Sequence, residues 1–357
     1  MRKNYIKSLN GLRVIATLAI FIHHYVHYIL PSINYDLVNY AFGFITLFFL
    51  LSGFVMMYNY KNKIENNLFN YKTYIVKKLV KFYPLYIFTL VLSIVVKPLP
   101  ELGLEFFKIL FANLFLIQAF IPIVTYNYTF NFVSWFISAL LFCYLLFPFV
   151  AKFLIHLNFK SIKMALILIS LIFLVDLVIT GRVNPAQDLN MVIYHSPITH
   201  FVEFLIGMLV FLIYDQRKYI YSLNKFTWTI LELVALRSVF LYAYFIPLIK
   251  EQYKWSILFL PSMVLLLVIF SLERGYASKF FSLSIFQRFS AISYEFYMIH
   301  GLVILYFLKL IEGITLTPLA LFTIIFLLTL TLSIILHYLI LNIQKSLLYF
   351  HLKGAMD

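Results

Sequence analysis

Apolar residues run along this chain in long blocks, separated by short polar segments rich in Lys and Arg. A helix needs about 20 apolar residues to cross the roughly 30 Å hydrocarbon core of a bilayer. Eleven blocks have about that length: residues 13–31, 40–59, 74–96, 104–122, 132–155, 162–180, 198–214, 226–248, 255–272, 289–310 and 317–342. The pattern predicts an all-α, polytopic integral membrane protein.

The positions of Lys and Arg decide how many of these blocks cross. Positive residues concentrate in cytoplasmic loops. If segment 104–122 does not cross, 20 of the 28 Lys and Arg residues lie in cytoplasmic loops, six lie outside, and Arg13 and Arg237 lie within spans. If it crosses, the clusters around Arg217 and at 274–288 move outside. We therefore predict ten spanning helices with both termini cytoplasmic. Segment 104–122 then either lies at the interface or re-enters.

Composition narrows the class of protein further. Of the 357 residues, 63% are hydrophobic and 12% are charged, which excludes a soluble protein. The net charge of +14 lies in short loops between spans, so topology explains it better than nucleic-acid binding. The single Cys143 allows no internal disulfide. We expect one transmembrane domain over residues 1–357, with no appended soluble domain and a retained first span.

The first span carries an unusual set of ionisable residues. Arg13 and His24 are eleven residues apart, which places them within about 20° on the helical wheel and roughly 16 Å apart along the axis. His27 falls near the same face, whereas His23 is turned about 100° from His24. Ionisable groups in a span usually mark function. Either this set is a reaction site, or Arg13 is an interface anchor and the histidines are polar contacts between helices.

Two further spans carry small or basic residues. Ser52 and Gly53 allow another backbone to approach closely, and this packing role is the simpler interpretation. Lys78 and Lys81 lie one turn apart at the expected cytoplasmic end of the third span. They either anchor the helix by the positive-inside rule or form a cradle for an anionic, phosphorylated cytosolic ligand.

Polar residues also recur at helical spacing later in the chain. His200 and Glu203 are three residues apart, as expected for a structural hydrogen bond or a tuned base. Ser293, Tyr297 and His300 form one stripe of another span. A second span with an intramembrane histidine is more than helix packing requires.

Three other residues have simpler expected roles. Trp135 begins a span, where tryptophan ordinarily anchors a helix at the membrane interface. Glu232 and Arg237 are five residues apart and too rotated for a good intrahelical pair. We expect each of them to reach a neighbouring helix.

Six motifs occur in an order that resembles the acyltransferase-3 family of bacterial inner-membrane proteins, which acylate sugars and other envelope molecules. Each motif is weak alone, but the ordered set is specific and covers about residues 5–305. The motifs are Leu9-Asn10-Gly11-Leu12-Arg13 with His24; Phe48-Phe49-Leu50-Leu51-Ser52-Gly53-Phe54; Lys78 with Lys81-Phe82-Tyr83-Pro84-Leu85-Tyr86; Ser134-Trp135, Ser138 and Tyr144-Leu145-Leu146-Phe147-Pro148; Glu203-Phe204-Leu205-Ile206-Gly207-Met208; and Ile292-Ser293-Tyr294 with Tyr297-Met298-Ile299-His300.

The resemblance implies an O-acyltransferase of the bacterial cytoplasmic membrane that moves acetyl from acetyl-CoA to a hydroxyl of an envelope polysaccharide or glycolipid. It implies that Arg13 and His24 are essential, with His24 as general base or as acyl carrier. Arg13 would bind CoA phosphate or stabilise developing negative charge, and Lys78 and Lys81 would hold the phosphates.

The remaining expected site residues line the substrate path: Ser52, Trp135, Ser138, Glu203, Ser293, Tyr297 and His300. We expect no metal and no permanently bound cofactor, since acetyl-CoA or another acyl-CoA is a co-substrate. The expected partners are the acyl-CoA donor, the glycan or glycolipid acceptor, membrane lipids and partner envelope proteins.

The chain departs from the family pattern at three places. Lys78 and Lys81 stand where arginines are usual, which keeps the charge but loses bidentate phosphate geometry. Residues 139–142 read Ala-Leu-Leu-Phe, where an acidic residue is often found. His200 stands where an arginine is common.

A transporter or flippase of a lipid-linked sugar is the alternative from another class, because intramembrane histidines also suit proton coupling. The sequence has no inverted repeat and no pair of Gly/Pro-broken helices, which transporters of this kind often show. A structural membrane subunit would leave the polar stripes unexplained.

Overall fold

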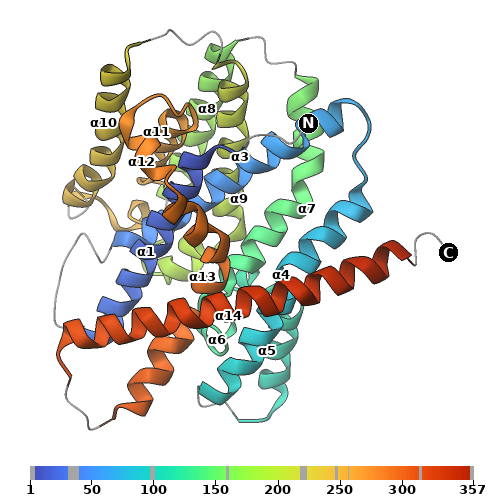
Figure 1. The fold of residues 1–357 in the computed structure, drawn as a ribbon, viewed down its shortest axis with the longest axis vertical. Helices are drawn as coiled ribbons and strands as arrows, with labels where there is room; N and C mark the ends of the chain where they lie inside the picture. Colours follow the sequence, from blue (N-terminus) through green and yellow to red (C-terminus); the bar gives the residue numbers. More distant parts are fainter. Residues whose placement is uncertain are drawn as a thin grey trace.

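A computed structural model describes residues 5–30, 40–96, 101–157, 161–217, 223–245, 248–255, 257–312 and 316–353. Within these ranges the chain is helical and contains no strand (Figure 1). The elements in order are α1 (Lys7–Ile29), η1 (Tyr40–Gly43), α3 (Phe44–Glu65), α4 (Tyr71–Val96), α5 (Leu104–Leu114), η2 (Gln118–Phe120), α6 (Val124–Tyr128), α7 (Trp135–His156), α8 (Ile162–Gly181), the π-helix η3 (Asn190–Tyr194), α9 (Pro197–Asp215), α10 (Lys225–Phe245), η6 (Glu251–Tyr253), α11 (Leu260–Ser271), α12 (Tyr276–Phe281), α13 (Ser284–Leu310) and α14 (Pro318–Lys353).

Eight helices in the described part of the chain are long and apolar enough to cross a membrane: α1, α3, α4, α7, α8, α9, α13 and α14. The prediction of an all-α polytopic membrane protein is therefore confirmed. The two other predicted spans correspond to α10 and α11. Helix α10 has 21 residues, but Lys225, Glu232 and Arg237 interrupt its apolar sequence. Helix α11 has 12 residues and begins next to Pro261, so it is shorter than the predicted segment 255–272.

Segment 104–122 is not one continuous helix, in agreement with the prediction that it does not cross. Helix α5 has 11 residues, or about 16 Å, which is half of the hydrocarbon thickness. Its C-terminal end lies beside the middle of α4, where the Tyr86 hydroxyl donates to the Asn113 carbonyl at 2.6 Å. The Ser138 hydroxyl of α7 donates to the Leu116 carbonyl at 2.5 Å. Non-helical backbone within a membrane needs such partners, so these contacts favour the re-entrant form over the interfacial one.

Close packing of α3 against α9 depends on two glycines. A Cβ atom on Gly53 would lie 1.9 Å from the Phe204 carbonyl oxygen. A Cβ on Gly207 would lie 2.1 Å from the Leu50 carbonyl oxygen. The packing role expected for Ser52-Gly53 is confirmed for Gly53, because only a residue without a side chain allows this approach.

Helix α4 contains Pro84, which leaves a gap in its backbone hydrogen bonding. The neighbouring carbonyls are bound from two other helices. Tyr294 of α13 donates its hydroxyl to the Phe82 carbonyl at 2.9 Å. Gln344 of α14 donates its amide to the Lys81 carbonyl at 2.9 Å. Helix α14 crosses both α13 and α4 on this face (Figure 1), so three helices together fix the position of Lys81.

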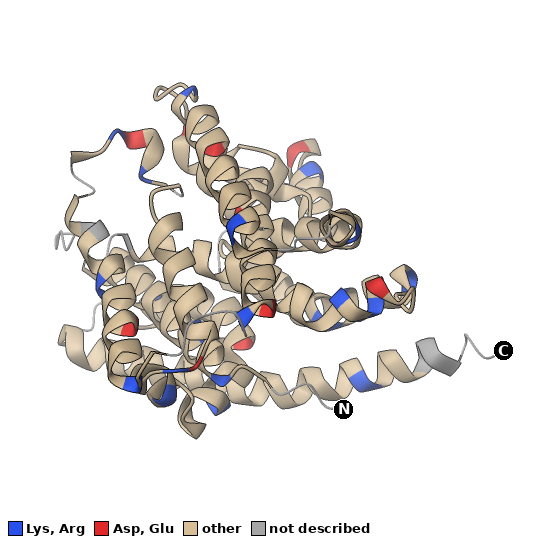
Figure 2. Ribbon diagram, turned by 90° about the horizontal axis from the view of Figure 1, so that it is seen from above, with Lys and Arg blue, Asp and Glu red and all other residues tan. Residues whose placement is uncertain are grey.

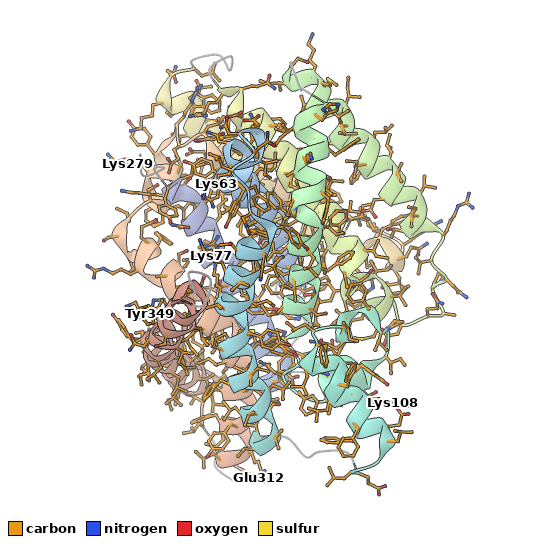
Figure 3. The ribbon with its side chains drawn as sticks, turned by 90° about the vertical axis from the view of Figure 1, so that its right-hand side faces the viewer. Lys63, Lys77, Lys108, Lys279, Glu312 and Tyr349 are labelled. Carbon is orange, nitrogen blue, oxygen red and sulfur yellow. The ribbon has the colours of Figure 1, made fainter. Side chains whose placement is uncertain are left out.

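Charged residues are sparse along the helices, and most of each ribbon is uncharged (Figure 2). Lys63 and Lys279 lie toward one end of the molecule, whereas Lys108 and Glu312 lie toward the opposite end (Figure 3). Lys279 belongs to the 274–288 cluster, which the charge distribution places in a cytoplasmic loop. Which end faces the cytoplasm stays a prediction.

Glu232 of α10 reaches a neighbouring helix, as expected. Its carboxylate accepts hydrogen bonds from the backbone N–H groups of Gly275, Ala277 and Ser278, at 2.8, 2.8 and 3.1 Å. These groups lie at the N-terminus of α12, where a carboxylate is favoured. Arg237, in contrast, is exposed on α10 and makes no such contact within the described ranges.

Candidate active site

A cavity of about 470 Å³ lies among α1, η1, α7 and the π-helix η3, and we call it the histidine cavity. Three imidazoles and several aromatic rings form most of its wall. It is lined by Ile20, His23, His24, His27, Tyr28, Phe42, Ile45, Tyr128, Phe132, Val133, Trp135, Asn190, Tyr194, Trp255 and Tyr297. A cavity of this size, lined by aromatic rings and a few polar groups, is of the kind that binds a small molecule.

Two histidines from distant parts of the chain meet at this cavity. Nδ1 of His24 on α1 lies 2.7 Å from Nε2 of His300 on α13. Nδ1 of His300 lies 2.6 Å from the Tyr297 carbonyl oxygen, which can only accept a hydrogen bond. His300 Nδ1 therefore carries a proton, and in the neutral ring its Nε2 accepts from His24 Nδ1. This assignment leaves the lone pair of His24 on Nε2.

The loop before α7 holds α13 in position against this pair. Asn131 donates its side-chain amide to the Met298 carbonyl at 2.8 Å. The Tyr297 hydroxyl donates to the Val133 carbonyl at 3.3 Å. The ring of Phe132 fits against Gly301, where a Cβ atom would lie 2.5 Å from it, and meets the edge of His24 with centroids 5.1 Å apart. Apolar contacts on this side orient the His24 ring.

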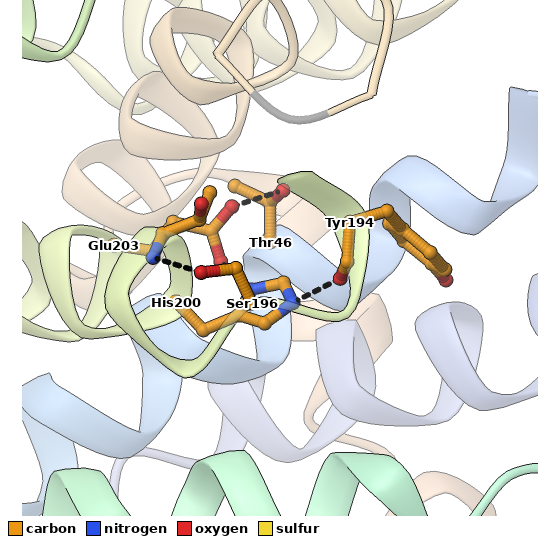
Figure 4. A network of polar contacts seen from close by, with 6 residues as sticks. Thr46, Tyr194, Ser196, His200 and Glu203 are labelled. Atoms are coloured by element: carbon orange, nitrogen blue, oxygen red, sulfur yellow. Dashed lines mark hydrogen bonds and ion pairs between the residues drawn. The ribbon is translucent and has the colours of Figure 1, made fainter. Parts of the chain in front are cut away.

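A second polar network lies behind the wall of the histidine cavity (Figure 4). Thr46 donates its hydroxyl to Glu203 Oε1 at 2.8 Å, and Glu203 Oε2 lies 2.7 Å from His200 Nδ1. His200 Nε2 lies 2.7 Å from the Tyr194 carbonyl oxygen and donates to it. The Phe49 ring stacks on His200 with centroids 4.1 Å apart. The network ties α3 and α9 to the π-helix and so positions Tyr194 in the cavity wall.

Neutral polar residues outside the spans lie in the wall of the histidine cavity or directly behind it. His195 is fully buried against Trp135, with ring centroids 4.3 Å apart, and burial lowers its pKa to about 3. His195 is therefore uncharged at neutral pH. Burial also raises the pKa of Tyr128 to about 12, so its hydroxyl keeps its proton and accepts from the Asn190 amide at 3.2 Å.

Two smaller cavities lie on the Arg13 side of the protein and share Arg13, Ser52, Lys81 and Tyr144. The first, of about 230 Å³, is bounded by α4, α13 and α14, and we call it the Arg13 cavity. The second, of about 290 Å³, is the mouth cavity and is lined also by Tyr5, Asn10, Asn59, Tyr60 and Lys78. Tyr297 lines both the Arg13 cavity and the histidine cavity. It therefore stands at the boundary between the two sides.

Aromatic rings hold the ammonium group of Lys78 in the mouth cavity. Its Nζ lies 4.4 Å from the ring centroid of Tyr144, 5.4 Å from that of Tyr74 and 5.6 Å from that of Tyr60. Cation–π contacts of this kind hold a cation without neutralising it. Lys78 makes no ion pair with a described residue, and its Nζ donates to Met56 Sδ at 3.1 Å.

A family model for the acyltransferase-3 acyltransferase domain matches residues 6–338, nearly the whole chain. The chain belongs to the acyltransferase-3 family. Comparison with curated proteins and with solved structures gave no match. The chain is thus a multi-pass membrane acyltransferase, and the resemblance noted in the sequence motifs is confirmed.

The structure of this acyltransferase-3 protein brings most of the predicted site residues to the three cavities. His24, Trp135 and Tyr297 line the histidine cavity, and His300 lies directly behind His24. Arg13, Ser52, Lys81 and Ser293 line the Arg13 cavity, and Lys78 lines the mouth cavity. Ser138 and Glu203 line none of them: Ser138 binds the re-entrant segment, and Glu203 belongs to the network behind the wall.

Two sequence interpretations change. His23 was expected to be separated from His24 by its position on the helical wheel, but both line the histidine cavity, with ring centroids 5.2 Å apart. The cavity extends around α1 far enough to include both faces. Trp135 is only 4% exposed, so it is part of the cavity wall and not an interface anchor.

The sequence analysis missed a buried pair in the Arg13 cavity. Glu295 Oε1 on α13 lies 2.9 Å from His337 Nδ1 on α14. An acidic residue within a span is itself a signal of function, and it could have singled out Glu295. In the described residues no group of three or more His, Cys, Asp or Glu side chains is arranged to hold a metal ion.

Proposed function

We propose that this protein transfers an acetyl group from cytosolic acetyl-CoA to a hydroxyl group of an envelope polysaccharide or glycolipid, and that it acts in the bacterial cytoplasmic membrane. The observation that carries the proposal is the pairing of a basic cavity and a histidine-lined cavity on the two sides of Tyr297. A transferase that joins a cytosolic donor to an acceptor on the other side requires two such sites.

The basic side suits the donor. Coenzyme A carries several phosphate charges, and Arg13, Lys78 and Lys81 place three cations around the mouth and Arg13 cavities. Lysines bind phosphate as point charges, without the fixed fork of arginine. The thioester would extend from these cations toward Tyr297. Arg13 and His24 are about 16 Å apart along α1, which is the distance this arm has to cover.

The histidine side suits the acceptor and supplies a base. Nε2 of His24 would take the proton of the acceptor hydroxyl as its oxygen attacks the thioester carbonyl carbon. A C–O bond forms, the C–S bond breaks, and the CoA thiolate leaves and takes the proton back from His24. His300 and the Tyr297 carbonyl keep the His24 proton on Nδ1, so the reactive lone pair stays on Nε2. If His24 instead carried the acyl group, the same atom would be acylated.

Purified full-length protein, incubated with radiolabelled acetyl-CoA and a membrane glycolipid extract, tests the proposal. Label should move into the glycolipid fraction while free CoA thiol is released in equal amount. Ping-pong kinetics would assign an acyl-carrier role to His24, and a sequential pattern would assign the base role. Movement of a lipid-linked sugar across vesicles without label transfer would favour a transporter and overturn the proposal.

A further inference from the structure

A fourth hollow in the molecule lies apart from the three cavities described above. It has a volume of about 370 Å³ and is formed by α8, the segment around Val183, the π-helix and the first turns of α9. Most of its lining is aliphatic. Its polar residues are Asp176, Thr180, Ser196 and Thr199, and we call it the Asp176 groove.

The carboxyl group of Asp176 has no evident partner. Asp176 is 9% exposed and makes no hydrogen bond or ion pair with a described residue. It lies on α8, whose buried residues are Ala165, Asp176 and Thr180. A carboxyl group within a span is expensive, and it usually faces a partner group or a ligand.

The rim of the Asp176 groove opens toward lipid. Leu171, Val175 and Ile179 of α8 are 56%, 54% and 61% exposed, and Ile198 at the start of α9 is 68% exposed. These residues also line the groove. Because its outer edge is aliphatic and continuous with the lipid-facing surface of α8, an occupant enters from the bilayer and presents a hydrocarbon chain.

The π-helix Asn190–Tyr194 is the wall between this groove and the histidine cavity. Asn190 and Tyr194 line the histidine cavity, while Val192 and Ile193 line the groove. A π-helix is rare and is frequently found at functional sites, where it widens one turn so that neighbouring residues face different ways. A ligand held in the groove therefore lies across the π-helix from the histidine cavity.

Charge decides which lipid fits. A carboxylate accepts hydrogen bonds from hydroxyl groups, and the hydroxyls of Thr180, Ser196 and Thr199 can donate and accept as well. Among the described residues, the lining contains no Lys or Arg that would neutralise a phosphate head group in a medium of low dielectric constant. The groove therefore matches a lipid whose head group is uncharged and rich in hydroxyls.

We propose that the Asp176 groove binds a neutral glycolipid, with an acyl chain along the α8 rim and a sugar hydroxyl on Asp176, and that this lipid is the acyl acceptor. The second half of the statement rests on the function proposed above. The head group would pass the π-helix and present another hydroxyl to His24.

Photolabelling of the full-length protein in nanodiscs tests the groove without relying on catalysis. The probe is a monoglucosyl diacylglycerol with a diazirine in one acyl chain, and labelled peptides are identified by mass spectrometry. Label should fall on residues 171–183 and 192–202. Val175→Trp fills the groove, and Asp176→Ala removes the carboxyl group that would accept a hydrogen bond from the sugar hydroxyl. Each variant should reduce labelling about tenfold. This is the order expected when one strong hydrogen bond, or packing contacts of similar energy, is lost.

Val178→Trp is the matched control, because Val178 lies on the same helix, is 58% exposed and does not line the groove. Its labelling should equal that of the wild type. Equal labelling of the Val175 and Val178 variants would overturn the proposal, and so would displacement of the probe by phosphatidylglycerol as effectively as by unlabelled glycolipid.

Comparison of groove labelling with acetyl transfer separates the two proposals. If the groove is labelled but the wild-type protein transfers no acetyl group, the groove proposal stands and the proposed reaction is overturned. If the Val175→Trp variant acetylates the glycolipid with an unchanged KM for the glycolipid, the proposed reaction stands and the groove proposal is overturned.

Discussion

The imidazole rings of His24 and His300 lie 5.0 Å apart between centroids, nearly parallel, with Nδ1 of one 2.7 Å from Nε2 of the other. They come from positions 276 residues apart in the chain. The contact distinguishes His24 from its neighbour His23, which lines the same cavity from the adjacent position on α1. A histidine with a fixed tautomer is better suited to repeated proton transfer than one whose proton can occupy either nitrogen.

The two adjacent histidines should therefore differ in catalysis. His24→Ala should lower acetyl transfer by about 10²–10⁴-fold, the usual contribution of a general base. His23→Ala should retain most of the activity, since the hydrogen bond to His300 Nε2 is made by His24. Radiolabel transfer by purified variants measures both, and equal membrane levels control for insertion. Equal activities, or a larger loss at His23, would mean that the catalytic face of α1 is misassigned.

His300 should act through His24 and not on the substrate. His300→Ala removes the acceptor for His24 Nδ1 and should lower kcat by up to about 10²-fold with little change in either KM, since a misoriented base loses part of its contribution. His300→Gln offers an amide oxygen at a similar position and should recover part of that rate. A rise in the acceptor KM without a fall in kcat would instead place His300 on the substrate path.

Lys78 and Lys81 should control donor binding. Charge reversal of both to Glu should raise the KM for acetyl-CoA much more than it lowers kcat, because ground-state phosphate contacts are lost. Lys77→Glu is the control, since Lys77 lies on the same helix but lines neither the mouth cavity nor the Arg13 cavity. If the Lys77 variant raises the KM as much as the double variant does, Lys78 and Lys81 act only through topology.

The α3–α9 contact predicts a sharp difference between two glycines. Gly53→Ala should destabilise the protein by about 1–3 kcal/mol or more, because its new methyl group meets the Phe204 carbonyl. Gly103→Ala should have little effect, since no atom lies within 4 Å of the position of its Cβ. Thermal unfolding in detergent compares them, and equal melting temperatures would show that α3 and α9 are not so closely packed.

Reporter fusions test the topology. A reporter after Asp357 and one inserted near Lys218 should both read cytoplasmic, and one near Asn184 should read outside. The re-entrant form of segment 104–122 underlies this expectation. A cytoplasmic signal near Asn184 would mean that the segment crosses and that the sides are reversed for every later loop.

The sequence contained the features that depend on short-range spacing. The helical wheel placed Arg13 and His24 on one face of α1, and the charge distribution identified 104–122 as a segment that does not cross. These are properties of one helix or of loops, so no tertiary information is required. Helical spacing also placed Ser293, Tyr297 and His300 on one stripe of their span.

The contacts between helices that define the site could not be predicted from the sequence. The contact of His24 with His300 depends on how α1 packs against α13, and the pairing of Glu295 with His337 depends on where α14 crosses. Ser138 belongs to a conspicuous motif, yet its hydroxyl binds the carbonyl of Leu116. A hydroxyl that serves a re-entrant backbone and one that lines a substrate path have the same sequence signature.

Tyr297 has a consequence for the cell as well as for the reaction. Its ring meets those of Phe136 and Phe48 with centroids 5.1 and 6.2 Å apart, and these aromatic side chains separate the histidine cavity from the Arg13 cavity. An apolar constriction of this kind repels water and ions. The reaction proposed above takes its donor from one compartment and its acceptor from another. Such a constriction would let an acyl group be passed on while the ion gradients that energise the membrane are kept.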